Sequence, residues 1–268
     1  ARHDLNGNGH IEIRAQMRTE STRGSYAIIL NPRLLTIGEG GSLEVPNGAL
    51  NYGNGKVSET RYRYLTGNGK IVAKYLYGDS NPGDSTYVFV QDGDETEVEV
   101  TSELKLSWLG NLSQKAYILK RGTLKALLKT GGTEAGGGGV FRQEGGYCEL
   151  KQLTLDYGSV TLAGGKMKIV NHNKISVASS GTFAVEGGTL EFETGNALDI
   201  VNRKVGFSGT STVRIPTHMG WPAMWTVAPG ADITVEFFWR PFGKGAPWPC
   251  PVGLSRNEGQ YASSKAPW

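Results

Sequence analysis

Residues 153–169 read Leu-Thr-Leu-Asp-Tyr-Gly-Ser-Val-Thr-Leu-Ala-Gly-Gly-Lys-Met-Lys-Ile and set a pattern that continues to residue 215. Apolar residues occur in pairs with one residue between them, which is the side-chain period of a β-strand. Gly, Asn or Ser occupies most gaps, so each unit is predicted to be a very short strand followed by a turn. The pairs begin at positions 153, 160, 167, 175, 183, 190, 198, 205 and 213, an even spacing of seven or eight.

Three units together form a longer repeat, which returns from position 153 to 175 and then to 198, and at this period the apolar positions fall into columns. The six columns are Leu153/Ile175/Leu198, Leu155/Val177/Ile200, Val160/Phe183/Val205, Leu162/Val185/Phe207, Met167/Leu190/Val213 and Ile169/Phe192/Ile215. Charges repeat on the outward phase at one constant separation, in Lys168, Glu191 and Arg214. The repeat predicts an all-β, three-sided parallel β-helix (a β-solenoid), in which side chains one coil apart stack at ~4.8 Å.

An antiparallel β-sandwich is the alternative architecture, because its turn signals also recur regularly, about every 8–12 residues. The spacing here is at or below the short end of that range. Hairpin markers are also scarce, since Asn-Gly and Asp-Gly are missing from this region. The alternating charges at one fixed separation favour the solenoid.

The rest of the chain divides by composition. Residues 1–34 form a polar N-terminal segment, and 35–78 are predicted to be first solenoid coils, because Leu43, Leu50, Val57, Tyr64 and Ile71 are evenly spaced by seven and three such steps would make one coil. Residues 79–147 have longer alternating runs and a Gly-rich loop, which indicates an inserted subdomain. Residues 148–215 are the second set of coils, and 216–268 are rich in aromatic residues and proline.

The bulk composition is that of a folded β protein. The chain has 268 residues and 39 glycines, and its 28 basic and 25 acidic residues leave a net charge of +3 without long runs. Neither nucleic acid nor an anionic membrane is therefore expected as a partner. No apolar run approaches the ~20 residues of a membrane span. The start at Ala1 lacks a signal-peptide core and fits loss of either an initiator Met or a longer leader.

Metal sites are not predicted, although one phrase near the N-terminus resembles half of a calcium loop. Asp4-Leu-Asn-Gly-Asn-Gly-His-Ile-Glu12 supplies the early ligands, but Ala15 stands where the bidentate acid is needed. Its Gly-Asn-Gly core returns at 53–55 and 67–69 without acids, which favours a structural turn. A cluster of His3, Asp4 and His10 has no fixed ligand geometry. We therefore expect no metal and no other cofactor.

Catalytic motifs are also missing, so no catalytic residue is assigned. The carboxylate pairs Glu191/Glu193 and Glu97/Glu99 would lie about 6–7 Å apart on one strand face, a separation that fits glycoside chemistry. Alternation on a solvated face explains the same residues, and we favour it. His172 lies in a turn as a solvated polar residue. Cys148 and Cys250 are far apart in the chain and are predicted to be free buried thiols.

Tryptophans concentrate after Pro216. Proline lacks the ladder donor, so this aromatic tail is expected to end the coils and to cover the open end of the solenoid, either as a cap or as an oligomerisation segment. Ligand recognition is the alternative role, because indole faces stack on sugars and partner surfaces. The candidate binding residues are Trp221, Trp225, Trp239 and Trp248.

The phrases Ser-Gly-Thr-Phe-Ala-Val (180–185) and Gly-Gly-Thr-Leu-Glu-Phe (187–192), with the columns above, resemble right-handed parallel β-helix proteins. That group includes viral tailspikes, fibres and decorations, polysaccharide lyases and bacterial adhesins. Lyase catalytic residues cannot be transferred, because the gaps of this region are too short to build a groove wall. What the resemblance implies is a rigid appendage that forms trimers.

Two functions therefore follow as expectations. The first is a structural or adhesive component of a virion, such as a phage fibre, head decoration or tail appendage, located in the virion or outside the cell. Its partners would be copies of itself in a trimer, capsid or tail proteins, and surface glycans as a further candidate. The second is a carbohydrate-active β-helix enzyme that depolymerises polysaccharides, and a secreted bacterial adhesin is a close relative of the first.

Overall fold

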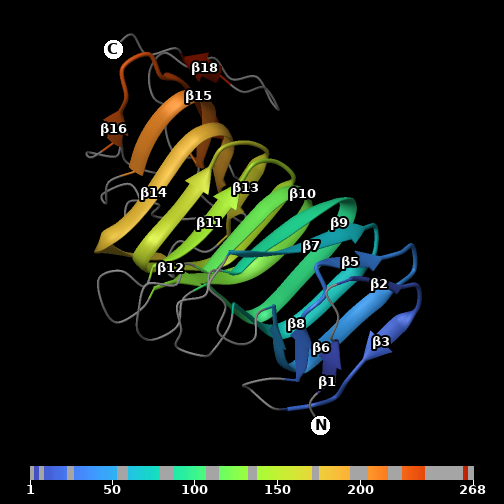
Figure 1. Cartoon of the computed structure of the whole chain (residues 1–268). Coiled ribbons are helices and arrows are strands. Elements are labelled where there is room, and N and C mark those ends of the chain that lie inside the picture. The colour runs from blue at the N-terminus through green and yellow to red at the C-terminus, as the bar shows by residue number, and fades with distance from the viewer. Residues whose placement is uncertain are drawn as a thin grey trace, which may run out of the picture.

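The computed structural model describes residues 3–5, 9–22, 27–52, 60–78, 87–106, 115–131, 138–170, 175–193, 205–216, 225–238 and 262–264. Within them all regular structure is β-strand, and eighteen strands form one sheet that coils into a parallel β-solenoid of about seven turns. Figure 1 shows the strands stacked side by side from the N-terminal to the C-terminal end. The prediction of a parallel solenoid is confirmed, and the antiparallel sandwich is excluded.

Each coil has three sides, which we call faces A, B and C in the order in which the chain passes through them. Ten strands lie on a single face. Face A holds β2 (His10–Ile13), β5 (Leu34–Ile37), β7 (Arg61–Gly67), β11 (Gly139–Gln143) and β16 (Trp225–Val227). Face B holds β3 (Gln16–Arg18), β13 (Lys166–Ile169) and β17 (Asp232–Phe238), and face C holds β1 (His3–Leu5) and β4 (Ile28–Leu30). The remaining strands bend around corners: β6 (Ser42–Asn51), β8 (Lys70–Tyr77), β9 (Tyr87–Lys105), β10 (Lys115–Thr130), β12 (Tyr147–Leu162), β14 (Ile175–Phe192) and β15 (Val205–Pro216).

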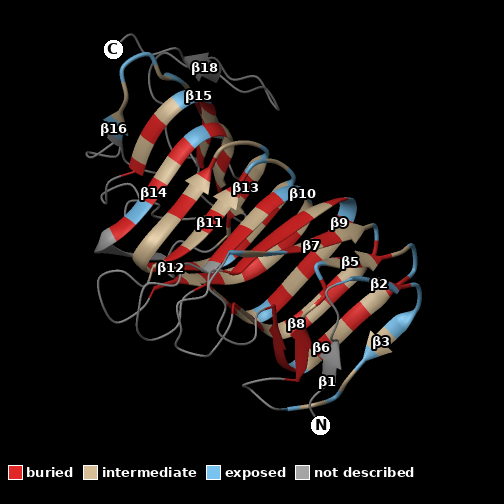
Figure 2. Ribbon diagram, viewed as in Figure 1, coloured by how far each residue is buried: buried red, intermediate tan, exposed pale blue. Residues whose placement is uncertain are grey.

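The core is built from inward-facing residues stacked one coil above another. Buried and half-buried residues alternate along the strands, as the banding in Figure 2 shows. Face C contributes an aliphatic ladder of Ile28, Leu50, Leu76, Leu104, Leu128 and Leu153. Face B contributes Leu43, Ile71, Val98, Leu124, Cys148, Met167, Leu190, Val213 and Val235. One continuous core cluster runs from Ile13 on face A of the first coils to Val235 on β17, so the described coils form one stack rather than separate domains.

The predicted columns are confirmed wherever the structure describes them. Leu153 pairs with Ile175, Val160 with Phe183 and then Val205, and Met167 with Leu190 and then Val213. Leu198 and Ile200, the last members of two columns, lie outside the described residues.

An aromatic ladder fills the core beside face A. The ring centroids of Tyr52 and Phe89 are 5.2 Å apart, those of Phe89 and Tyr117 5.2 Å, and those of Tyr117 and Phe141 5.9 Å. The Tyr117 hydroxyl donates to Oε1 of buried Gln91 at 2.7 Å, so the one polar atom of this buried ring is satisfied. These contacts bury large apolar rings at tilted and offset geometries that aromatic pairs prefer.

Glycines form a column at the corner between faces A and B. Gly122, Gly146, Gly165 and Gly188 all have positive φ. A Cβ on Gly165 would lie 2.4 Å from the Gly146 carbonyl oxygen, which itself accepts a 3.0 Å hydrogen bond from the amide of Lys166. The corner needs glycine for two reasons, a left-handed backbone and direct stacking on the previous turn. The Gly67-Asn-Gly69 phrase lies at the same corner, which confirms it as a structural turn. Residues 53–55 lie outside the described part.

The first coils are longer than the three steps of seven that the sequence suggested. Leu43 pairs with Ile71, and Leu35 pairs with Leu65, so residues stacked in successive turns are 28 and 30 positions apart. The difference lies between faces C and A, because Leu50 of face C and Leu65 of face A are fifteen positions apart. The even sevenfold spacing was therefore a coincidence of apolar positions, and Val57 falls outside the described residues.

Residues 87–106, 115–131 and 138–147 are coils of the same solenoid, which differs from the expected insertion at 79–147. β9 pairs with β7, β8 and β10, and β10 pairs with β11 and β12, all in parallel. Two core columns, Leu76–Leu104–Leu128 and Leu65–Gln91–Leu119, continue from the first coils into this region without a break. Its different sequence pattern arises because β9 and β10 continue through two corners, which joins separate strands into long alternating runs.

The coils also continue past the expected boundary at Pro216. β16 pairs in parallel with β15 on face A, and β17 pairs in parallel with β15 on face B. The antiparallel strand β18 (Ala262–Ser264) then pairs with the outer edge of β17. One further coil can form in this proline-rich sequence, because Pro229 lies in the connection between β16 and β17, outside the hydrogen-bonded ladder.

Candidate functional site

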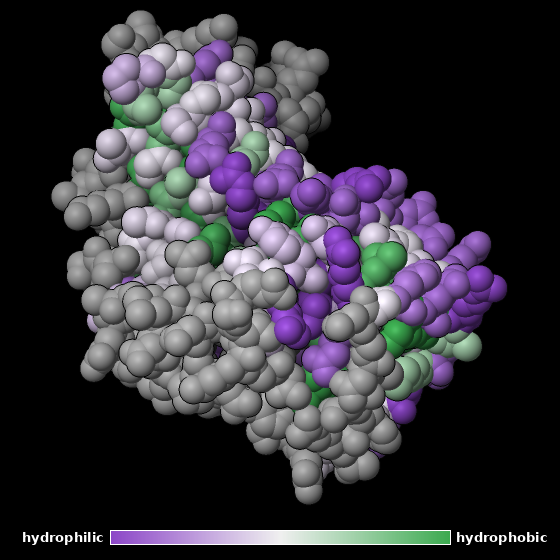
Figure 3. Space-filling view, in the orientation of Figure 1, coloured by the Kyte–Doolittle hydropathy of each residue, from purple (hydrophilic) through white to green (hydrophobic). Residues whose placement is uncertain are grey.

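The outer side of face B carries a ladder of charged residues. Its central column runs through Arg18, Glu44, Val72, Glu99, Lys125, Glu149, Lys168, Glu191, Arg214 and Glu236. The sign of the charge alternates from coil to coil along this column, and Val72 interrupts the alternation between two glutamates. Figure 3 shows a described surface that is mainly hydrophilic, with smaller hydrophobic areas between the polar groups.

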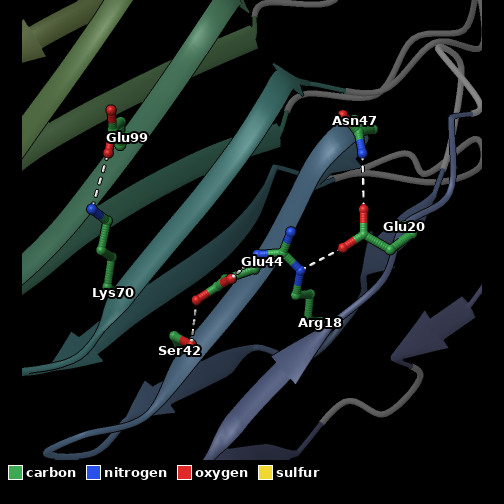
Figure 4. A network of polar contacts seen from close by, with 7 residues as sticks. All are labelled: Arg18, Glu20, Ser42, Glu44, Asn47, Lys70 and Glu99. Atoms are coloured by element: carbon green, nitrogen blue, oxygen red, sulfur yellow. Dashed lines mark hydrogen bonds and ion pairs between the residues drawn. The ribbon is translucent and has the colours of Figure 1, made fainter.

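Ion pairs join neighbouring coils along this ladder. Figure 4 shows Arg18 between Glu44 (2.8 Å) and Glu20 (2.5 Å), and Lys70 directed at Glu99 (2.9 Å) on the next coil. Farther along, Arg214 contacts both Glu191 and Glu236. The predicted register of Lys168, Glu191 and Arg214 is confirmed.

Both carboxylate pairs considered for glycoside chemistry lie on this ladder as ion-paired surface residues. Glu97 is 3.0 Å from Lys125, and Glu193 is 2.9 Å from Lys168. Burial raises the pKa of Glu97, but the hydrogen bond from Lys125 and the charges of Lys70 and Lys125 outweigh this effect. The pKa therefore lies below its ordinary value of 4.5, whereas a general acid needs a raised one.

The ladder predicts loss of stability in acid. Glu97 and Glu44 have folded-state pKa values below 4.5, and that of Glu44 is lowered mainly by hydrogen bonds from Gln16 and Ser42. Such groups stabilise the folded state above pH 4.5, and this contribution disappears as the pH falls through the lowered pKa. We expect the melting temperature to be level from pH 7 to about 5 and to fall below about pH 4.5. Calorimetry over this range checks it, and a melting temperature that rose toward pH 3 would contradict it.

The outer side of face A differs, because its central coils carry apolar residues. Val88, Val90 and Ala116 form a second buried cluster, against which Tyr64, Ile118 and Val140 pack. Tyr62, at the edge of this apolar patch, is 46% exposed and is the one large apolar side chain that is exposed within the described ranges. Its ring centroid lies 6.2 Å from that of Tyr64, with the planes 19° apart.

A shallow groove of about 460 Å³ adjoins the patch toward the N-terminal end. It is lined by Gly9, Arg33, Leu34, Tyr64 and Thr66.

Polar groups form a chain beside this groove. The Thr36 and Thr66 hydroxyls are 3.0 Å apart, and Nε2 of His10 is 2.8 Å from the Thr36 hydroxyl. His10 thus contacts a hydroxyl rather than a metal-ligand set, and no group of three potential metal ligands occurs in the described part of the chain.

The proposed binding tryptophans remain a prediction. Trp225 begins β16, where it pairs with the core residue Val205. Trp221, Trp239 and Trp248 lie outside the described residues. The apolar patch on face A was not found from sequence, although one signal existed: Tyr-Val-Phe-Val at 87–90 is apolar on both strand phases, which is typical of a strand covered on both sides.

Cys148 is a free, fully buried thiol, as predicted. Burial, with the nearby Glu149 charge as a lesser cause, raises the pKa of this thiol far above its ordinary range. The thiolate needed for nucleophilic chemistry is therefore disfavoured, and Cys148 acts as a core residue. Cys250 and His172 lie outside the described residues.

The fold and these surfaces define a parallel β-solenoid with one charged and one partly apolar outer face. No family model, curated protein or solved structure matches the chain. Within the described ranges, no helix is long and apolar enough to cross a membrane.

Proposed function

We propose that this chain is a structural or adhesive β-solenoid, most simply a virion component such as a phage fibre, head decoration or tail appendage. It would act as a rigid spacer in the virion or outside the cell, and present its outer faces to a partner surface. The proposal includes association of the chain into a trimer and attachment to capsid or tail proteins.

The observation that carries this proposal is the unbroken parallel ladder from β2 to β17, which shares one hydrophobic core. Repeat stacking of this kind couples each coil to its neighbours, so the rod resists local bending and opening. The ion-paired ladder of face B supports the same role. Each exposed pair contributes only ~0–1 kcal/mol, but the network links neighbouring coils along the rod.

Measurement of assembly and activity tests the proposal. We expect sedimentation equilibrium to give three times the chain mass of 28.8 kDa, with the assembly resisting SDS at room temperature. Electron microscopy should show short rods. We expect no release of reducing ends or unsaturated sugars from a panel of capsular polysaccharides. A monomer at micromolar concentration would refute the trimer, and sugar release would refute the structural function.

A carbohydrate-active enzyme is the second candidate. The observation in its favour is the groove beside Tyr62 and Tyr64, because aromatic rings next to hydroxyl and guanidinium groups suit sugar binding. The same polysaccharide panel separates the two functions, since only the enzyme would shorten the polymer.

A further inference from the structure

The inward side of β7 begins with two arginines instead of apolar residues. Arg61 pairs in register with Tyr87 of β9. Arg63 pairs with Phe89, and both aromatic partners are buried. Arg61 is half-buried, whereas Arg63 is only 7% exposed. Positive charge therefore enters the edge of the aromatic core at the corner between faces C and A, where β7 begins.

The guanidinium of Arg63 is bent back toward the start of its strand. Its Cζ lies 5.8 Å from the ring centroid of Tyr87, which is the register partner of Arg61. Its Nη1 donates to the carbonyl of Tyr62, the preceding residue, at a long 3.5 Å. Burial is the main cause that lowers the pKa of Arg63, Tyr87 opposes it, and the charge of Arg61 lowers this pKa further. The two arginine side chains therefore lie close together at this corner.

Arg63 has more hydrogen-bond donors than the described residues satisfy. A guanidinium has five N–H donors. Nε of Arg63 is buried without an acceptor among the described residues, and Nη1 has only the long contact with the Tyr62 carbonyl. The Tyr87 ring offers a cation–π contact but no acceptor in the plane of these donors. A buried guanidinium in this state is costly unless an anion pairs with it.

Arginines elsewhere on the solenoid show what this corner lacks. Arg18, Arg121 and Arg214 lie on the outward side, and each contacts two carboxylates. Neither Arg61 nor Arg63 forms an ion pair with a carboxylate of the described ranges. Among the described arginines, the one with the least access to water is thus without a described counter-ion.

We propose that Arg61 and Arg63 form an oxyanion site at the corner between faces C and A, which takes a carboxylate or a phosphate group. An oxyanion fits because two parallel N–H groups of a guanidinium match two oxygens of one such group. The entrance lies at the start of β7, where Thr60 is exposed and Arg61 is half-buried. The site goes beyond the structural function proposed above and requires neither the trimer nor the groove on face A.

Thermal melting of the purified chain with added anions tests the site. Sodium acetate and sodium phosphate are each titrated at constant ionic strength, which sodium chloride maintains. An oxyanion at ten times its dissociation constant should raise the melting temperature by about 3–5 °C above that in chloride alone. The oxyanion with the lower dissociation constant distinguishes a carboxylate ligand from a phosphate ligand.

Two variants remove the cations of the site. Arg63→Met keeps a long side chain but removes the buried charge, so it should abolish the oxyanion response and melt no lower than the parent in chloride. Arg61→Gln changes a half-buried residue and should weaken oxyanion binding about tenfold. The matched control is Arg142→Gln, which removes an ion-paired arginine from the outward side of face A and should respond like the parent.

Equal melting temperatures in chloride and in both oxyanions would overturn the proposal. Oxyanion shifts that persist in both Arg63→Met and Arg61→Gln would also overturn it, because they would then come from general salt effects. A less stable Arg63→Met, with no oxyanion response in the parent, would show a structural partner of the Tyr87 ring only. Circular dichroism establishes that each variant is folded, and Arg61→Gln decides alone if Arg63→Met does not fold.

Discussion

Gly165→Ala should lower the free energy of unfolding by about 2–4 kcal/mol. Gly165 has φ of +73°, where an L side chain is strained, and its new Cβ would approach the Gly146 carbonyl oxygen to 2.4 Å. That oxygen cannot move freely, because it accepts the hydrogen bond from the Lys166 amide that joins the two coils. Chemical denaturation followed by circular dichroism measures the loss.

Gly206→Ala is the matched control for this effect. Gly206 lies within β15, its φ is not in the left-handed region, and no atom lies within 4 Å of an added Cβ. Alanine in a strand lowers the entropy of the unfolded chain, so this variant should be as stable as the parent or slightly more stable. Equal losses for Gly165→Ala and Gly206→Ala would show that the corner column does not require glycine.

Phe141→Ala should cost about 3–5 kcal/mol, the usual range for removing a buried aromatic ring. Phe141 is completely buried, it stacks on Tyr117, and it pairs in register with Val160 on the next coil. The rigid coils on both sides cannot collapse into the space, so we expect a cavity as well as lost burial. Thermal melting and denaturant titration give the change.

The neighbouring residue supplies the control, because Arg142 points outward from the same strand. Its ion pairs with Glu144 and Glu186 are partly exposed, so Arg142→Ala should change stability by about 0–1 kcal/mol. A cost for Phe141→Ala no greater than this would mean that the aromatic ladder contributes little to the core.

The second half of the solenoid could be predicted because its connections are short and nearly equal. Leu162 and Val185, which pair across one turn, are 23 positions apart, and every intervening strand has the same apolar-x-apolar form. When all connections have nearly the same length, residues that stack in space recur at a constant spacing in the sequence. The charges of Lys168 and Glu191 then reported the register independently.

The first half has the same architecture, but its coils vary in length, so the sequence shows no constant repeat. Leu35 and Leu65 stack 30 positions apart, whereas Gln143 and Leu162 stack 19 apart, so no single period relates them. Gln91 and Gln143 also occupy core positions, where a search for apolar columns does not expect polar residues. Their amides satisfy backbone carbonyls at the corner between faces A and B, as in the bond from Gln91 to the Thr96 carbonyl.

The ion pairs of the arginines could not be predicted from the sequence, because an arginine residue alone does not reveal whether it has a carboxylate partner. Arg63 lies between two tyrosines and Arg121 between Lys120 and Gly122, and neither sequence contains an adjacent acidic residue that would indicate an ion pair. Only the fold places Asp92 of the preceding coil 2.7 Å from Arg121 and leaves Arg63 over an aromatic ring. Such pairing depends on contacts between coils, which no local pattern contains.

The unequal coils have a consequence for how this chain can change in length. In four successive turns the stacked residues of faces C and A are fifteen positions apart, as in Leu76/Gln91 and Leu128/Gln143, and in the next turn, Leu153/Leu162, they are nine apart. The connection at one corner can thus lengthen or shorten while the stacked core keeps its cross-section. A sequence inserted at the corner between faces C and A should leave the strand pairing and register unchanged. That corner is therefore the natural place to display a peptide or an epitope tag.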